Sequence, residues 1–119
     1  MKFGKKSLTR RLKKLQSFEF LFEEEYSIGS TFHFADLREY TKNAAANEDK
    51  TTLLKIGEIL NDCFKNGNDE ITNDLMVTYF EGLPNRSVKV ILKYVDKELK
   101  QEARSYLKNW KKFCANLRN

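Results

Sequence analysis

Residue types that usually mark catalytic sites, metal sites or disulfide frameworks are scarce in this chain of 119 residues. There is one histidine, His33, and there are two cysteines, Cys63 and Cys114. The cysteines lack CxxC spacing and fall at apolar positions of helical patterns, so we expect two buried, reduced thiols. No motif for nucleophilic catalysis surrounds His33, which we interpret as a partly buried ring. We therefore expect no enzyme, no cofactor and no metal.

Long hydrophobic runs are absent as well. No stretch approaches the roughly 18 apolar residues of a membrane-spanning helix, so we expect none. The basic residues 1–6 are not followed by the apolar segment of a secretory signal. We interpret residues 1–6 as a flexible basic leader, and we expect a cytoplasmic protein.

The residues that are abundant indicate one folded domain with an uneven charge. Nine Phe, five Tyr and one Trp need a core, and a chain of this length can supply one. The net charge of +5 is concentrated at the ends of the chain. Residues 1–14 and 97–119 are strongly basic, whereas residues 15–96 carry an excess of acid. The overall charge alone therefore does not indicate nucleic acid as a partner.

Apolar residues recur at steps of three and four, which is typical of amphipathic helices. We predict helices over residues 7–26, 32–46, 50–65 and 70–82, and one or two more over residues 86–117, with two favoured. Thr31, Asp49 and either Asn68 or Asp69 are the expected caps, and Asp96 would cap the last helix. The sequence thus predicts an all-α single domain over residues 1–119, a bundle of five to six antiparallel helices. HEAT-like or armadillo-like stacking remains an open alternative, because no sequence repeat is visible.

The acidic middle of the chain is the candidate partner-binding surface. Carboxylates beside tyrosines suit a basic protein, because the charges steer the encounter and the rings anchor it. An ordinary solvated face is the alternative, and for one member, Glu81, that alternative is pairing with Arg86 or Lys89. The candidate residues are Glu23, Glu24, Glu25, Tyr26, Asp36, Glu39, Tyr40, Asp69, Glu70, Asp74 and Glu81.

The basic ends support a different function, that of a nucleic-acid-associated helical module. This interpretation uses the leader together with four residues near the other end, Lys108, Lys111, Lys112 and Arg118. It predicts one continuous basic face and steeply salt-dependent binding. A solvated helix end is the simpler alternative, because base-reading motifs are missing.

Several stretches resemble an uncharacterised bacterial all-helical family. Residues 65–83 combine a short Gly/Asp turn, an amphipathic helix and a Glu and Leu before the break. Residues 34–37, residues 90–95 and Trp110 fit the same plan, although Val95 and Asp96 stand where related sequences often have Gly. Such proteins are similar to immunity proteins of polymorphic toxin systems, including contact-dependent growth inhibition. The resemblance covers about half the chain and supplies no catalytic residue.

The resemblance implies a protein that binds a cognate toxin domain one to one and occludes its active site. Many such toxins are basic nucleases, and an acidic surface would imitate the phosphates of their substrate. The positive overall charge fits this mechanism better if the basic ends lie away from the interface. The nucleic-acid-associated module and a non-catalytic protein-interaction adaptor are the alternatives.

Overall fold

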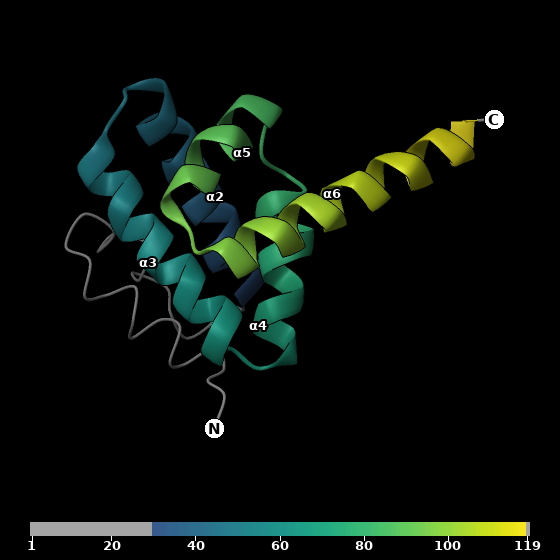
Figure 1. Ribbon diagram of the computed structural model, residues 1–119, viewed down its shortest axis with the longest axis horizontal. Helices are drawn as coiled ribbons and strands as arrows, with labels where there is room; N and C mark the ends of the chain where they lie inside the picture. The colour runs from purple at the N-terminus through teal and green to yellow at the C-terminus, as the bar shows by residue number, and fades with distance from the viewer. Residues whose placement is uncertain (1–29, 119) are drawn as a thin grey trace.

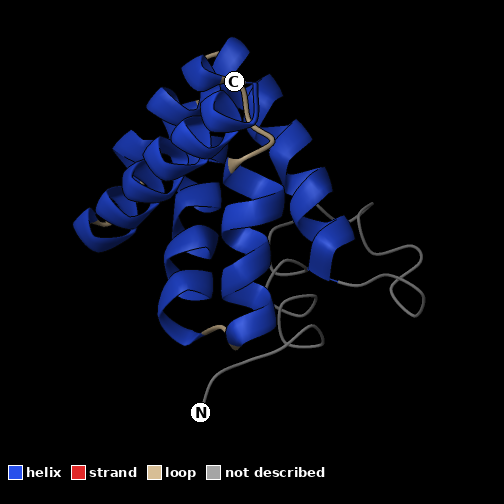
Figure 2. Ribbon diagram, turned by 90° about the vertical axis from the view of Figure 1, so that its right-hand side faces the viewer, coloured by secondary structure: helices blue, strands red, loops and turns tan. Residues whose placement is uncertain are grey.

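The computed structural model describes residues 30–118, whose elements are helices without a β-strand (Figures 1 and 2). The elements are α2 (Ser30–Ala46), α3 (Lys50–Asn66), α4 (Asp69–Asp74), the π-helical turn η2 (Leu75–Phe80), α5 (Asn85–Ile91), the 3₁₀ turn η3 (Leu92–Tyr94) and α6 (Lys97–Arg118). The predicted all-α class is confirmed. The expected helix over residues 7–26 and the leader lie outside the described residues.

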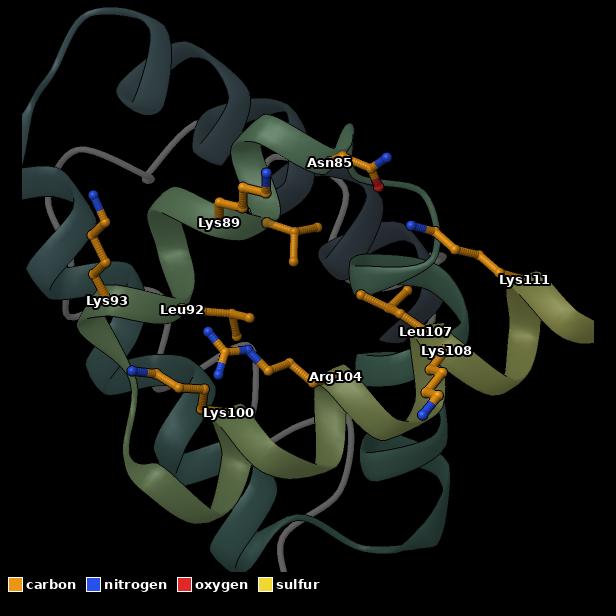
Figure 3. A pocket seen from close by; sticks show the side chains of 10 residues that line it. Asn85, Lys89, Leu92, Lys93, Lys100, Arg104, Leu107, Lys108 and Lys111 are labelled. Atoms are coloured by element: carbon orange, nitrogen blue, oxygen red, sulfur yellow. The ribbon is translucent and has the colours of Figure 1, made fainter.

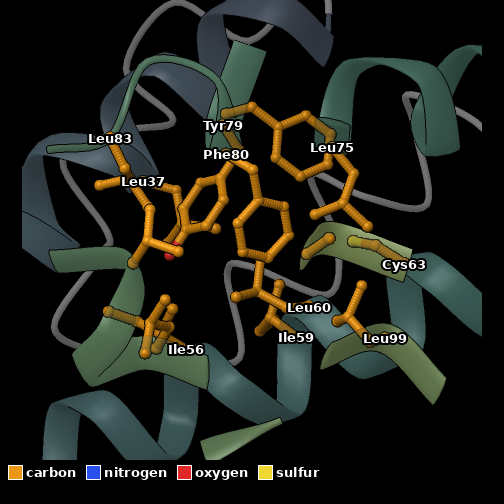
Figure 4. Packing of buried hydrophobic residues seen from close by; sticks show 14 of the residues in the cluster. Leu37, Ile56, Ile59, Leu60, Cys63, Leu75, Tyr79, Phe80, Leu83 and Leu99 are labelled. Atoms are coloured by element: carbon orange, nitrogen blue, oxygen red, sulfur yellow. The ribbon is translucent and has the colours of Figure 1, made fainter. Parts of the chain in front are cut away.

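Helix α2 occupies the centre of the bundle. It contacts α3, α4, η2 and α5, which together run from Lys50 to Ile91 in the sequence. Its Phe34 and Leu37 are buried. Figure 4 shows Leu37 in the core together with Leu60 of α3 and with Leu75, Tyr79 and Phe80 of η2. In a linear repeat array each unit contacts only its sequence neighbours. The described helices therefore form an irregular bundle around α2 and not a linear stack.

Helix α3 follows its sequence pattern closely. The Asp49 carboxylate accepts hydrogen bonds from the Thr52 N–H at 3.1 Å and the Thr52 hydroxyl at 2.7 Å, which confirms the predicted N-cap. These two bonds lower the pKa of Asp49. The helix ends at Gly67, where an added Cβ would meet the Cys63 carbonyl and the Ile71 side chain. Its predicted apolar face is buried, with Phe64 only partly so.

Helix α4 begins at the Asn68 cap, whose Oδ1 accepts the Ile71 N–H at 3.0 Å, and then widens into the π turn η2. The Glu81 N–H bonds to the Met76 carbonyl five residues back, which gives this turn one more residue than an α-helical turn. Tyr79 and Phe80 are consequently both fully buried. The sequence alone left open which of them faces the core.

The predicted break between residues 82 and 85 is present, and the predicted separation of the last segment into two helices is confirmed. Between η3 and α6 the chain becomes extended at Val95. The Asp96 N–H donates to the Asn61 Oδ1 at 2.8 Å, and the Asp96 carboxylate pairs with the Lys65 ammonium at 2.7 Å. Asp96 was expected to cap α6 with its side chain, but that side chain instead ties the turn to α3.

A buried polar chain links α2 to the π turn. The Thr41 hydroxyl donates to the Leu37 carbonyl at 2.8 Å, so the Tyr79 hydroxyl, 2.6 Å away, donates to the Thr41 oxygen. Both side chains are fully buried. Burial raises the pKa of Tyr79 far above its ordinary value. The phenol therefore stays neutral and acts as a fixed donor between the two elements.

Candidate functional site

Helix α6 carries one apolar stripe that starts in the core and continues beyond it. Leu99 and Ala103 are fully buried, whereas Trp110, Phe113 and Leu117 are 36%, 53% and 70% exposed. The outer half of the helix projects away from the other helices (Figure 1). The Trp110 and Phe113 rings stack on each other with centroids 5.7 Å apart. The steps of three, four and seven between Leu99, Tyr106, Trp110, Phe113 and Leu117 indicate one apolar helix face in the sequence, but the structure buries only its inner part.

The other face of α6 forms one wall of a basic groove of about 630 Å³, with α5 and η3 as the opposite wall (Figure 3). Val88, Leu92 and Leu107 supply its apolar surface, and no carboxylate lines it. Its cations are Lys89, Lys93, Lys100, Arg104, Lys108 and Lys111. The ion pairs between described residues lie elsewhere, at Lys42 with Glu39 and at Lys65 with Asp96. The groove is thus a concentration of positive charge that the described chain does not neutralise.

The acidic residues predicted on α2 lie close to one another. The Glu39 carboxylate pairs with the Lys42 ammonium at 3.2 Å on the exposed surface. Asp36 and Tyr40 are partly buried neighbours. Burial is the main cause that raises the pKa of Tyr40, and the negative charge of Asp36 adds to it. The remaining predicted residues of this group, Glu23, Glu24, Glu25 and Tyr26, lie outside the described residues.

Two of the acidic residues predicted on α4 meet a third that the sequence did not single out. Asp69 and Glu70 line a shallow hollow of about 630 Å³ together with Glu102 of α6. Phe64 and Met76 contribute its apolar surface. Asp74, also predicted, is partly buried on the same helix and is not among the residues that line the hollow. Glu102 escaped notice because it lies in the basic segment at the other end of the chain.

Glu81 has a structural contact that sequence reasoning missed. The Tyr106 hydroxyl donates to the Glu81 Oε2 at 2.6 Å and so connects α6 to the end of η2. Burial, the hydrogen bond and the charge of Glu81 together raise the pKa of Tyr106 to about 12. The expected pairing of Glu81 with Arg86 or Lys89 is replaced by this contact. Glu81 therefore positions the helix that carries both the exposed stripe and one wall of the groove.

Comparison with known proteins gives a family but no function. The chain matches the family described as Domain of unknown function (DUF7674) over residues 6–111. It belongs to this family. No curated protein and no solved structure matches the chain significantly. The DUF7674 match ends at Lys111, so it includes the cations of the groove and Trp110 but not Phe113 or Leu117.

In the described part of this DUF7674 chain, no three His, Cys, Asp or Glu residues are grouped so as to hold a metal ion. Cys63 is buried and outside any disulfide, as expected, whereas Cys114 forms no disulfide either but is only partly buried. The His33 side chain lies outside the described part. Each helix that the structure describes is too short or too polar to cross a lipid bilayer. The candidate binding surfaces of the described residues are therefore the exposed stripe of α6 and the two hollows beside that helix.

Proposed function

We propose that this chain is an immunity-type protein that binds a cognate bacterial toxin domain and neutralises it by occluding the toxin's active site. The observation that supports this function best is the outer half of α6. Trp110, Phe113 and Leu117 stand at positions i, i+3 and i+7 of a projecting helix. An amphipathic helix that inserts into an apolar groove of another protein uses this spacing for its anchoring side chains.

The residues on this helix also fit a protein interface in their chemistry. Trp is among the side chains that most often dominate binding energy, and stacked rings present a large rigid area at little entropic cost. Lys108, Lys111 and Lys112 are exposed on the remaining surface of this part of the helix, and the first two also line the basic groove. They favour a partner groove with carboxylates at its rim.

The active site of a nuclease is such a carboxylate-lined groove, because carboxylates hold its catalytic metal ions. A lysine-flanked helix would pair with those carboxylates and exclude substrate. The choice of a toxin as the partner rests on the resemblance to immunity proteins. The acidic residues on α2 and α4 remain a predicted second contact, in which Asp69 and Glu70 would meet basic residues of the same partner.

Co-purification from the native host, followed by a functional assay, tests this proposal. The tagged chain should retain one protein in equal proportion, and that protein should lose its toxic activity when the complex forms. Trp110→Ala and Phe113→Ala should each weaken the complex by about 30-fold, which corresponds to a hot-spot loss of about 2 kcal/mol. The matched control is Leu54→Ala, since Leu54 is 55% exposed but lies on α3.

Three results would overturn the proposal. The first is a bound protein that keeps its full activity in the complex, which would indicate an adaptor and not an inhibitor. The second is a complex whose affinity falls equally with Leu54→Ala and Trp110→Ala, and the third concerns self-association. A parallel arm with Asp69→Lys and Glu70→Lys measures whether the acidic hollow contributes. Sedimentation of the chain alone checks whether the exposed stripe instead joins two copies, which would also overturn the proposal.

A further inference from the structure

Positive charge is arranged on two facing walls of the α5–α6 groove. Lys89 and Lys93 come from α5 and η3, and four cations come from α6. Arg104 extends from α6 towards Leu92 on the opposite wall (Figure 3). No carboxylate lines the groove, and no ion pair of the described chain involves its cations. Like charges held around one concavity repel each other, so an anion that enters it is attracted from both sides.

We propose that this groove binds the phosphodiester backbone of a nucleic acid, independently of sequence. The α6 cations, Lys100, Arg104, Lys108 and Lys111, follow steps of four, four and three and so share one face of the helix. They extend over roughly 17 Å of helix axis at about 1.5 Å per residue. One strand of a duplex places a charge about every 3.4 Å along the helix axis and a single strand is more extended, so this row accompanies about three to five phosphates. A linear array of cations suits a linear array of anions.

The remaining lining of the groove agrees with binding that does not read sequence. Val88 and Leu92 are nearly buried and Leu107 is partly buried, so the floor offers apolar surface to sugar rings. Asn85 is the only uncharged polar side chain in the lining. Base recognition needs several directed donors and acceptors, which this lining does not provide.

A nucleic acid fits this groove better than a lipid surface or an acidic protein does. A bilayer is flat, whereas these cations surround a hollow, and the exposed apolar stripe of α6 lies on a different face from the groove. An acidic protein would need to present a narrow row of carboxylates. The phosphodiester backbone is narrow and uniformly charged, and it enters a groove without rearrangement. This inference does not rest on the proposed function, whose anchors are the outer apolar stripe and whose partner is a protein; Lys108 and Lys111 are the residues that both use.

The test uses the purified full chain and a fluorescent single-stranded oligonucleotide of about 20 nucleotides with mixed sequence. If six cations each neutralise one phosphate, the slope of log affinity against log salt is about −4, and affinity falls about 300-fold between 50 and 200 mM salt. Arg104→Gln combined with Lys108→Gln should reduce the slope to about −3 and weaken binding about 25-fold at 0.1 M salt. Gln retains good helix propensity, and circular dichroism confirms that α6 persists.

The matched control is Lys50→Gln combined with Lys112→Gln. It removes the same charge at two exposed helical positions that neither line the groove nor continue its row of cations. It should leave the affinity within about threefold of the unmodified chain. Equal losses in the two double variants would overturn the proposal, because binding would then follow total charge. Absence of oligonucleotide binding at 50 mM salt would also overturn it, as would binding only to vesicles with 30% anionic lipid.

Discussion

The buried hydrogen bond between Thr41 and Tyr79 predicts that removing one hydroxyl lowers the free energy of unfolding more than removing the other. Tyr79→Phe removes the phenolic hydroxyl but leaves the Thr41 hydroxyl donating to the Leu37 carbonyl. The Thr41 oxygen then loses the donor that it accepts from, but no buried donor is left without a partner. The free energy of unfolding should therefore fall by only about 1 kcal/mol. Thr41→Val has nearly the same shape but removes the only acceptor of the Tyr79 hydroxyl. A buried donor without a partner should cost about 2.5 kcal/mol.

The double variant distinguishes this explanation from a simple loss of contacts. With both hydroxyls removed, no buried donor is left unsatisfied, and the loss should return to about 1 kcal/mol. The two substitutions should therefore be strongly coupled in a double-mutant cycle. Adding Tyr79→Phe to Thr41→Val should restore stability, although each change is destabilising alone.

Urea denaturation, followed by circular dichroism, measures these effects. With a slope of about 1.5 kcal/mol per molar urea, the midpoint should fall by roughly 0.7 M for Tyr79→Phe and 1.7 M for Thr41→Val. The reasoning is refuted if Tyr79→Phe is the more costly of the two changes. It is also refuted if the two losses add in the double variant, since the hydroxyls would then act independently.

Two further predictions concern close packing and pH. Gly57→Ala should lower stability by about 1–2 kcal/mol in the same assay despite a gain in helix propensity, because the new Cβ would lie 2.2 Å from the Tyr94 carbonyl oxygen. Gly82→Ala, which meets only the end of the Arg38 side chain, should cost less, and an equal loss would contradict this account. The raised pKa of Tyr106 favours the protonated phenol in the folded state, so its stabilisation is present below about pH 10 and is lost as the pH rises towards 12. The stability advantage of the unmodified chain over Tyr106→Phe should therefore shrink across this range, and a constant difference would show that the Glu81 contact is not responsible.

Local signals explain why much of the fold could be predicted from the sequence. The Asp49 cap depends on residues three apart, and the buried face of α3 depends on steps of three and four. Pro84 ends the preceding turn through its own geometry. The π turn could not be anticipated, because Tyr79 and Phe80 are both apolar and an α-helix would bury only one of them. Tertiary packing decides that an extra residue is accommodated there.

The candidate site was harder to predict because its parts come from separate elements. The apolar stripe of α6 was recognised, but a stripe indicates which face is apolar and not what covers it, so the exposure of Trp110 was missed. The groove brings Lys89 of α5 and Arg104 of α6 to facing walls, although the turn between η3 and α6 separates them in the sequence. Glu81 and Tyr106 are twenty-five residues apart. Neither pairing leaves a trace in sequence periodicity.

The π turn has a consequence for how changes in chain length would propagate. It is equivalent to an α-helix with a single-residue insertion, placed between the core contact at Leu75 and the α6 contact at Glu81. In a regular α-helix such an insertion would rotate everything after it by about 100°, but the wider π turn takes up the extra residue locally. Deleting Val77, which is exposed, would therefore restore regular α-helix and leave the Glu81 carboxylate facing Tyr106. One residue of length at this point changes the packing of the core but not the direction in which the outermost helix leaves the domain.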